Sequence, residues 1–102
     1  SIVDLARWRQ EHLRGERGVD GLVRAATYKV LHTPLEGQTY ALGWRSPQRD
    51  GVRIITHDGS NGLWTAVVTF DPATDRGVVI VANAGHNVQG VLNVATPWVV
   101  NR

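Results

Sequence analysis

Residues 64–83 read WTAVVTFDPATDRGVVIVAN and contain two β-strand patterns separated by a turn. The first pattern, residues 64–70, is rich in β-branched and aromatic side chains, and the second, residues 77–82, is almost wholly aliphatic. The connection, residues 71–76, contains Asp, Pro and Thr, which favour turns. Two strands joined by so short a connection pair in antiparallel fashion. The stretch therefore predicts a β-hairpin, and the other elements are expected to pack around it.

Further strand patterns precede the hairpin. Tyr40, Leu42 and Trp44 alternate with small or polar residues, which predicts a half-buried strand. Residues 46–51 form a turn signal, and residues 52–56 predict the next strand. The glycine-rich residues 59–62 are expected to break that strand.

Helical patterns lie at both ends of the chain. Ser1 and Asp4 match a variant of the capping box, and the helix that follows should end near Gly15 and Gly18. A second, short helix is expected over residues 23–31, before Pro34. An apolar helical stripe near the C-terminus is expected to kink or end at Pro97, and consists of Val88, Val91, Leu92, Ala95 and Val99.

These elements predict an α+β fold. We expect an antiparallel sheet of three to four strands, with the N-terminal and C-terminal helices packed on one of its faces. Residues 1–102 would form a single partial domain, because a chain of 102 residues that begins inside a helix signal at Ser1 is expected to be a piece of a larger protein.

The composition narrows the classes of function. The net charge is only +2, and the arginines are spread among acidic residues, so no nucleic-acid binding is expected. There is no cysteine, which excludes disulfide bonds and thiolate metal sites. No apolar stretch approaches the ~20 residues of a membrane span.

The four histidines differ in their surroundings. His12, His32 and His86 fit surface, packing or capping roles in helices and loops. His57 closes a β pattern and is followed at once by a glycine-rich turn. A strand end with accessible amides and a titratable ring is a suitable place to hold a developing oxyanion, so His57 is the leading candidate for chemistry.

Two other interpretations of this segment are weaker. A metal site built from His57, Asp58 and His86 would lack ligand spacing, because neighbours on a strand point to opposite faces. Ser60 as a nucleophile lacks the strained elbow sequence and a nearby base. We therefore expect neither a metal nor another cofactor.

Several stretches follow one another in a fixed order. They are residues 40–44 (YALGW), 57–62 (HDGSNG), 70–72 (FDP) and 77–83 (GVVIVAN), preceded by residues 4–8 (DLARW) and 31–34 (LHTP). This ordered set resembles the C-terminal part of the serine β-lactamase-like superfamily and covers nearly the whole chain. That group includes class C β-lactamases, D-Ala-D-Ala carboxypeptidases and penicillin-binding-protein-like esterases.

The resemblance implies roles for the residues around His57. His57, Asp58 and Gly59 would be the family's third active-site box, which is Lys-Thr-Gly in many members and His-x-Gly in many esterase-like ones. His57 would face the substrate, and the main-chain N–H of Ser60 would be one of two oxyanion donors. Asp58 and Asn61 would line the substrate pocket. An Asp58 that faced this pocket would repel substrate carboxylates.

The family's other catalytic boxes, Ser-x-x-Lys and Tyr-x-Asn, do not occur in these 102 residues. The resemblance thus implies a C-terminal fragment, inactive alone, of a hydrolase that cleaves a small ester, amide or peptide substrate through an acyl-serine. A histidine in place of the box lysine favours an esterase or peptidase over a β-lactamase, because lysine stays cationic at neutral pH and histidine need not. The family would fit a periplasmic or secreted parent, but no residue pattern here assigns a location.

The family's sheet has five strands, two of which come from the N-terminal part and add beside the last strand of the hairpin. Residues 77–83, from Gly77 to Asn83, would then be an unpaired edge. We expect this edge to bind the missing N-terminal portion or a second copy of the chain. The alternative is a free-standing, non-catalytic binding or assembly module derived from the same fold.

Overall fold

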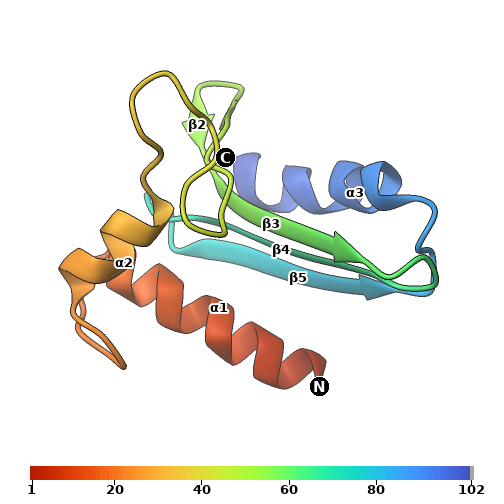
Figure 1. Ribbon diagram of the computed structural model, residues 1–102, viewed down its shortest axis with the longest axis horizontal. Helices are drawn as coiled ribbons and strands as arrows, with labels where there is room; N and C mark the ends of the chain where they lie inside the picture. Colours follow the sequence, from red (N-terminus) through yellow and green to blue (C-terminus); the bar gives the residue numbers. More distant parts are fainter. Residues whose placement is uncertain (102) are drawn as a thin grey trace.

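The computed structural model describes residues 1–101 as a three-stranded antiparallel sheet with helices on both faces (Figure 1). The strand order is β3 (Ile55–Ser60), β4 (Thr65–Asp71) and β5 (Arg76–Ala82), so β4 lies in the middle. α1 (Ile2–Glu16) and α2 (Ala25–His32) lie on one face, and α3 (Val88–Val100) lies on the other (Figure 1). The predicted α+β class is confirmed.

The predicted hairpin forms the centre of the sheet. β4 (Thr65–Asp71) pairs with β5 (Arg76–Ala82) along its whole length, from Thr65 opposite Ala82 to Asp71 opposite Arg76. In the connecting turn, the Asp71 carboxylate accepts a hydrogen bond from the Ala73 amide at 3.0 Å. A short polar side chain of this type commonly stabilises such turns.

The third strand of the sheet extends further than its glycine content suggested. β3 (Ile55–Ser60) pairs with β4 from Ile55 opposite Phe70 to Ser60 opposite Thr65. The expected break within residues 59–62 therefore begins only after Ser60. Gly59 remains in the ladder opposite Ala66, and the turn is made by Gly62, whose φ is +91°.

A two-stranded ribbon precedes β3. β1 (Gln48–Arg49) and β2 (Val52–Arg53) flank a turn at Asp50 and Gly51, with φ values of 52° and 77°. Two successive positive φ values match the tight turns that join twisted antiparallel strands.

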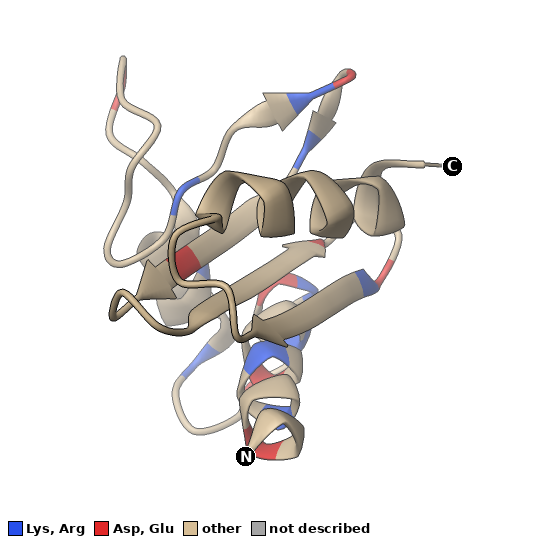
Figure 2. Cartoon of the chain, turned by 90° about the vertical axis from the view of Figure 1, so that its right-hand side faces the viewer, with Lys and Arg blue, Asp and Glu red and all other residues tan. Residues whose placement is uncertain are grey.

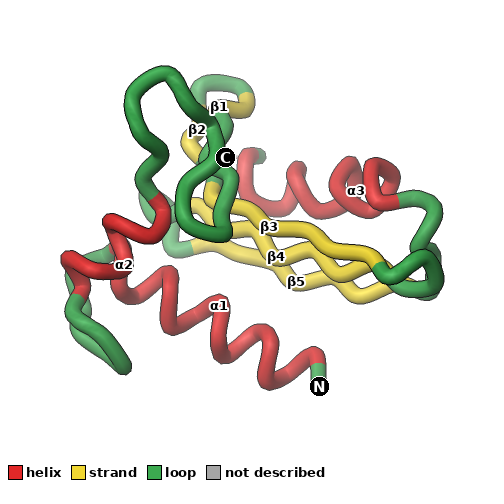
Figure 3. Tube along the Cα trace, in the orientation of Figure 1, coloured by secondary structure: helices red, strands yellow, loops and turns green. Residues whose placement is uncertain are grey.

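The prediction of a strand over residues 40–44 is wrong. This segment is a loop that contributes one isolated bridge, Tyr40 to Arg45 (Figure 3). Trp44 is buried, but Tyr40 and Leu42 are exposed. Gly43 has a φ of +85°, which turns the chain back and prevents a continuous strand.

The first two helices lie close to their predicted positions. α1 (Ile2–Glu16) begins with the capping box, in which the Ser1 and Asp4 side chains each accept from the other's backbone N–H. α2 (Ala25–His32) ends two residues before Pro34. The two helices contact each other where α1 passes beneath α2 (Figure 1).

α3 (Val88–Val100) contains the expected apolar stripe but does not end at Pro97. The Asn87 side chain caps its first turn by accepting from the Gly90 amide at 3.1 Å. Beyond Pro97, Val99 and Val100 are buried against Val52 and Ile54. The helix thus continues past Pro97, because tertiary packing compensates for the backbone hydrogen bond that proline cannot donate.

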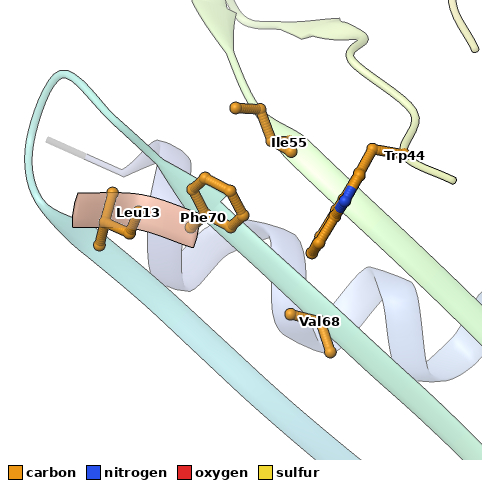
Figure 4. Close-up of a cluster of buried hydrophobic side chains, with 5 residues drawn as sticks. All are labelled: Leu13, Trp44, Ile55, Val68 and Phe70. Carbon is orange, nitrogen blue, oxygen red and sulfur yellow. The ribbon is translucent and has the colours of Figure 1, made fainter. Parts of the chain in front are cut away.

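The expectation that all helices cover one face is also wrong. Val68 and Phe70 of β4 pack with Leu13 of α1 and with Trp44 (Figure 4). Val67, their neighbour on β4, packs instead with Val91 and Ala95 of α3. Successive residues of a strand point to opposite faces, so a strand with adjacent buried valines needs a cover on each side.

The two covers differ in chemistry. α3 carries no charged residue, whereas α1 carries several (Figure 2). Between α1 and α2, the buried His12 Nδ1 lies 2.8 Å from His32 Nε2, and His32 Nδ1 lies 2.9 Å from a Glu16 carboxylate oxygen. Arg53 of β2 approaches the other Glu16 oxygen at 3.5 Å and donates to the His32 carbonyl at 3.2 Å. This His12–His32–Glu16–Arg53 network joins both helices to the ribbon.

Charge and burial act on the network in opposite directions. Burial alone would raise the pKa of Glu16, but the hydrogen bonds and charges of His32 and Arg53 hold it below its ordinary value. Burial is the main cause that lowers the pKa of His12 from 6.5 to about 4, and the neighbouring His32 ring adds to the effect. His12 is therefore neutral in the folded protein at neutral pH.

Among residues 1–101, no helix combines the length and apolar character that a membrane span requires.

Candidate functional site

The candidate site lies along the outer edge of β3, the side that does not face β4. The Arg45 amide donates to the Thr56 carbonyl at 2.8 Å, and the Thr56 amide donates back at 2.9 Å. Backbone groups of alternate residues point to the same side of a strand. The N–H groups of Asp58 and Ser60 therefore point the same way as that of Thr56, away from the sheet and beyond the point where Arg45 covers the edge.

His57 lies on the α1 face of β3, in the same row as Ile55. Its side chain is exposed, and its ring meets the edge of Trp44 with centroids 6.4 Å apart. Trp44 is only 3% exposed and stacks on Trp8 of α1 at 5.2 Å. The imidazole thus lies against a fixed aromatic wall while remaining accessible to a ligand.

Asp58 projects to the opposite face of β3 and forms an ion pair with Arg45. The Arg45 side chain is 43% exposed and that of Asp58 is 18% exposed, so the pair lies at the surface with its carboxylate turned inward. The backbone bridge between Arg45 and Thr56 places the two side chains on the same face, two residues apart along the edge.

Gly59 and Ser60 end the strand. A methyl group at Gly59 would meet no atom within 4 Å, so this position is open. The Ser60 hydroxyl donates to the Gly85 carbonyl at 2.8 Å and accepts from the Gly62 amide at 3.0 Å. The hydroxyl thus holds the turn after β3 to the loop before α3, while the Ser60 N–H faces the free edge.

Asn61 follows Ser60 in the turn. Its carbonyl oxygen accepts from the amides of Leu63 and Trp64 at 3.0 and 2.9 Å. This oxygen therefore stabilises the hairpin turn, and only the NH₂ group of the side chain is left to meet a ligand. A pocket role for Asn61 stays a prediction.

A groove of about 740 Å³ adjoins the α3 side of this edge. It is lined by Arg45, Arg49 and Thr56 on one side and by Gln89 and Asn93 of α3 on the other. The ion pair between Arg45 and Asp58 thus stands between the groove and the free end of β3.

Sequence reasoning missed Arg45, Trp44 and Gly85 at this site. The alternating pattern that includes Leu42 and Trp44 indicated that Trp44 is buried, but not that it contacts His57. Arg45 could not be found from its own segment, because its partner Asp58 lies in β3. Gly85 is needed because a methyl group there would lie 2.3 Å from the Gly62 carbonyl carbon. Among residues 1–101, no group of three or more His, Cys, Asp or Glu side chains is placed to hold a metal ion.

The fold is of the α+β class, and the outer edge of β3 carries His57, Asp58 and Gly59 with main-chain N–H groups directed away from the sheet. The chain belongs to the β-lactamase family: the family model described as Beta-lactamase matches residues 1–96. Neither a curated protein nor a solved structure matched the chain.

Proposed function

We propose that this chain forms the C-terminal wall of the active site of a β-lactamase-like serine hydrolase. In the complete protein, an ester or amide substrate would acylate a serine that lies outside these 102 residues, and water would then release the acyl group. The chain alone would be inactive, because it contains neither Ser-x-x-Lys nor Tyr-x-Asn.

The free end of β3 is the observation that carries this proposal. The Ser60 N–H faces outward, where it can donate to an oxygen that becomes negative in the transition state. His57 is exposed beside it on the face that α1 and Trp44 support. Removing one donor of such a pair typically costs ~10²–10³ in turnover.

His57 would line the pocket and act as a polar group toward the substrate and the serine. Its position against Trp44 restricts the ring without burying it. Replacement of the family's lysine by histidine favours an esterase or peptidase, since a permanent positive charge at this position is absent.

The test uses the complete product of the gene that encodes this chain. His57→Ala should lower the rate of acylation by a p-nitrophenyl ester by about 10²-fold while leaving the circular dichroism spectrum unchanged. His86→Ala, at an exposed position in the loop before α3, is the matched control and should retain full activity. Unchanged acylation in His57→Ala would remove His57 from the mechanism, and the isolated 102-residue chain should hydrolyse no ester above background.

The outer edge of β5 supports a proposal about assembly. β5 pairs with β4 on one side, and no other strand among residues 1–101 pairs with its second side. Val81 on this strand is 44% exposed. β5 has seven residues, of which all after Arg76 are uncharged, and an unpaired strand of this kind is a template for another strand. The N-terminal portion of the parent, or a second copy, would pair there.

Sedimentation velocity tests the assembly on the isolated chain. The chain should self-associate, and Val81→Lys should weaken this association because a charge on an edge strand opposes strand pairing. Val30→Lys, which changes an exposed valine of α2, should leave the association unchanged. A wild-type chain that stays monomeric at high concentration and does not bind the N-terminal portion would remove the role of β5. A gene product no longer than this chain that still assembles would favour the alternative, a non-catalytic assembly module.

A further inference from the structure

We propose that Arg45 determines the substrate class of this site, by neutralising Asp58 so that the pocket prefers substrates without a charge near the scissile bond. The inference rests on the proposed hydrolase function and concerns the ion pair on the groove side of β3. It assigns to Arg45 a role in specificity and none in the bond-breaking steps.

Arg45 is held in place by its main chain. Two hydrogen bonds of 2.8 and 2.9 Å tie its backbone to Thr56, which fixes its Cα beside the strand that carries Asp58. Only the side chain of Arg45 therefore needs to become ordered for its guanidinium to reach the Asp58 carboxylate. A pair with a fixed backbone on both sides loses less entropy on formation than one between two mobile surface residues.

The charges around the pair balance. Arg45 and Arg49 line the groove together with Asp50, and Asp58 supplies the second negative charge beside them. α3, which forms the opposite wall of the groove, carries no charged residue. A substrate group that enters along the α3 side of β3 thus meets two arginines and two aspartates, with no net charge to attract a carboxylate.

Either half of the pair would polarise this corner if it stood alone. Asp58 without Arg45 would place a negative charge two residues from the Ser60 N–H and repel an anionic substrate. Arg45 without Asp58 would present an unpaired guanidinium, which binds carboxylates well because its N–H donors match their geometry. The observed pairing cancels both effects, and the uncharged acyl group is the substrate type that gains by this.

The test compares two esters in the complete gene product. p-Nitrophenyl butyrate is neutral, and the p-nitrophenyl monoester of glutaric acid carries a carboxylate at a similar length. The measured quantity is the ratio of kcat/KM for the anionic ester to that for the neutral ester. Since each variant is compared through its own ratio, a general loss of activity or of folded protein cancels.

The two isosteric variants should change this ratio in opposite directions. Asp58→Asn should raise it by about three- to tenfold, and Arg45→Gln should lower it by about the same factor, as expected for one partly screened charge near the substrate. The double variant should return close to the wild-type ratio. Arg24→Gln, which removes an exposed charge at the start of α2, should leave the ratio unchanged.

The possible results separate the two proposals. Ratios that stay constant in both single variants, or that shift in the same direction, would overturn the role of Arg45 while leaving the hydrolase proposal intact. An unmodified gene product that hydrolyses neither ester would overturn the hydrolase proposal itself, and the inference with it.

Discussion

Acid should destabilise this protein through His12. The imidazole lies between α1, α2 and the Trp44 ring and is only 6% exposed. The 2.8 Å contact between His12 Nδ1 and His32 Nε2 needs one nitrogen as donor and the other as acceptor. A positive charge on His12 is disfavoured there, chiefly because the ring is buried.

The magnitude follows from the pKa of His12, which falls from 6.5 to about 4 on folding. Between these values the unfolded chain binds a proton that the folded protein does not. The stabilisation is therefore complete above pH 6.5 and is lost as the pH falls toward 4. At about 1.36 kcal/mol for each pH unit, the loss reaches about 3 kcal/mol. This is a large part of the ~5–15 kcal/mol that stabilises a typical domain.

Urea unfolding at successive pH values, followed by tryptophan fluorescence, measures this loss. The carboxylates Asp4, Glu11 and Glu16 also have lowered pKa values, so the diagnostic quantity is the difference between wild type and His12→Gln. Glutamine can still donate to His32 but does not titrate, and the slope between pH 4 and 6.5 should fall in this variant.

A control variant makes the same histidine-to-glutamine substitution at a position outside the His12–His32–Glu16–Arg53 network. His86→Gln replaces an exposed histidine and should retain the wild-type slope. If wild type and His12→Gln show the same pH dependence in this window, the buried pair is not what makes the protein acid-sensitive.

Two further predictions concern the loop before α3 and the helix itself. Gly85→Ala should lower the free energy of unfolding by about 1–3 kcal/mol, because its methyl group would meet the backbone of Gly62 at 2.3 Å, whereas Gly59→Ala meets nothing and should leave stability nearly unchanged. Equal melting temperatures for these two variants would contradict the close approach of the loop to the turn. Asn87→Ala should lose about 1 kcal/mol through the missing cap of α3, while Asn93→Ala, which loses only an exposed bond to Gln89, should lose less. Thermal melts of the two asparagine variants decide this comparison, and a reversed order would refute the capping role.

Local patterns predicted the elements that short-range physics determines. The β4–β5 hairpin and the Ser1 cap depend on neighbouring residues, and both formed as expected. The segment at residues 40–44 matched a strand pattern equally well, but Gly43 adopts a positive φ that alternation alone does not reveal. Pro97 was expected to stop α3, and packing of the residues after it outweighed the lost hydrogen bond.

The candidate site was predicted only in part, because some of its features are local in sequence and others depend on tertiary contacts. The position of His57 near a strand end is a local feature, although β3 continues to Ser60 because Gly59 fits the ladder with ordinary backbone angles. The pairing of Asp58 with Arg45 depends on which loop crosses the edge of β3, and no pattern within either segment contains that information. The two-sided cover of the sheet was in principle visible in the adjacent valines Val67 and Val68.

The different chemistry of the two helical layers has a consequence for how the protein comes apart. α3 is attached through aliphatic contacts, whose strength weakens on cooling and is almost indifferent to protons. α1 and α2 are attached through a proton-sensitive network as well. Mild acid should therefore release the α1–α2 side while α3 stays docked, and cold should weaken the α3 side first. The two helical layers should therefore detach from the sheet under different conditions. The partly unfolded forms obtained by acid and by cold should expose opposite faces of the same three strands.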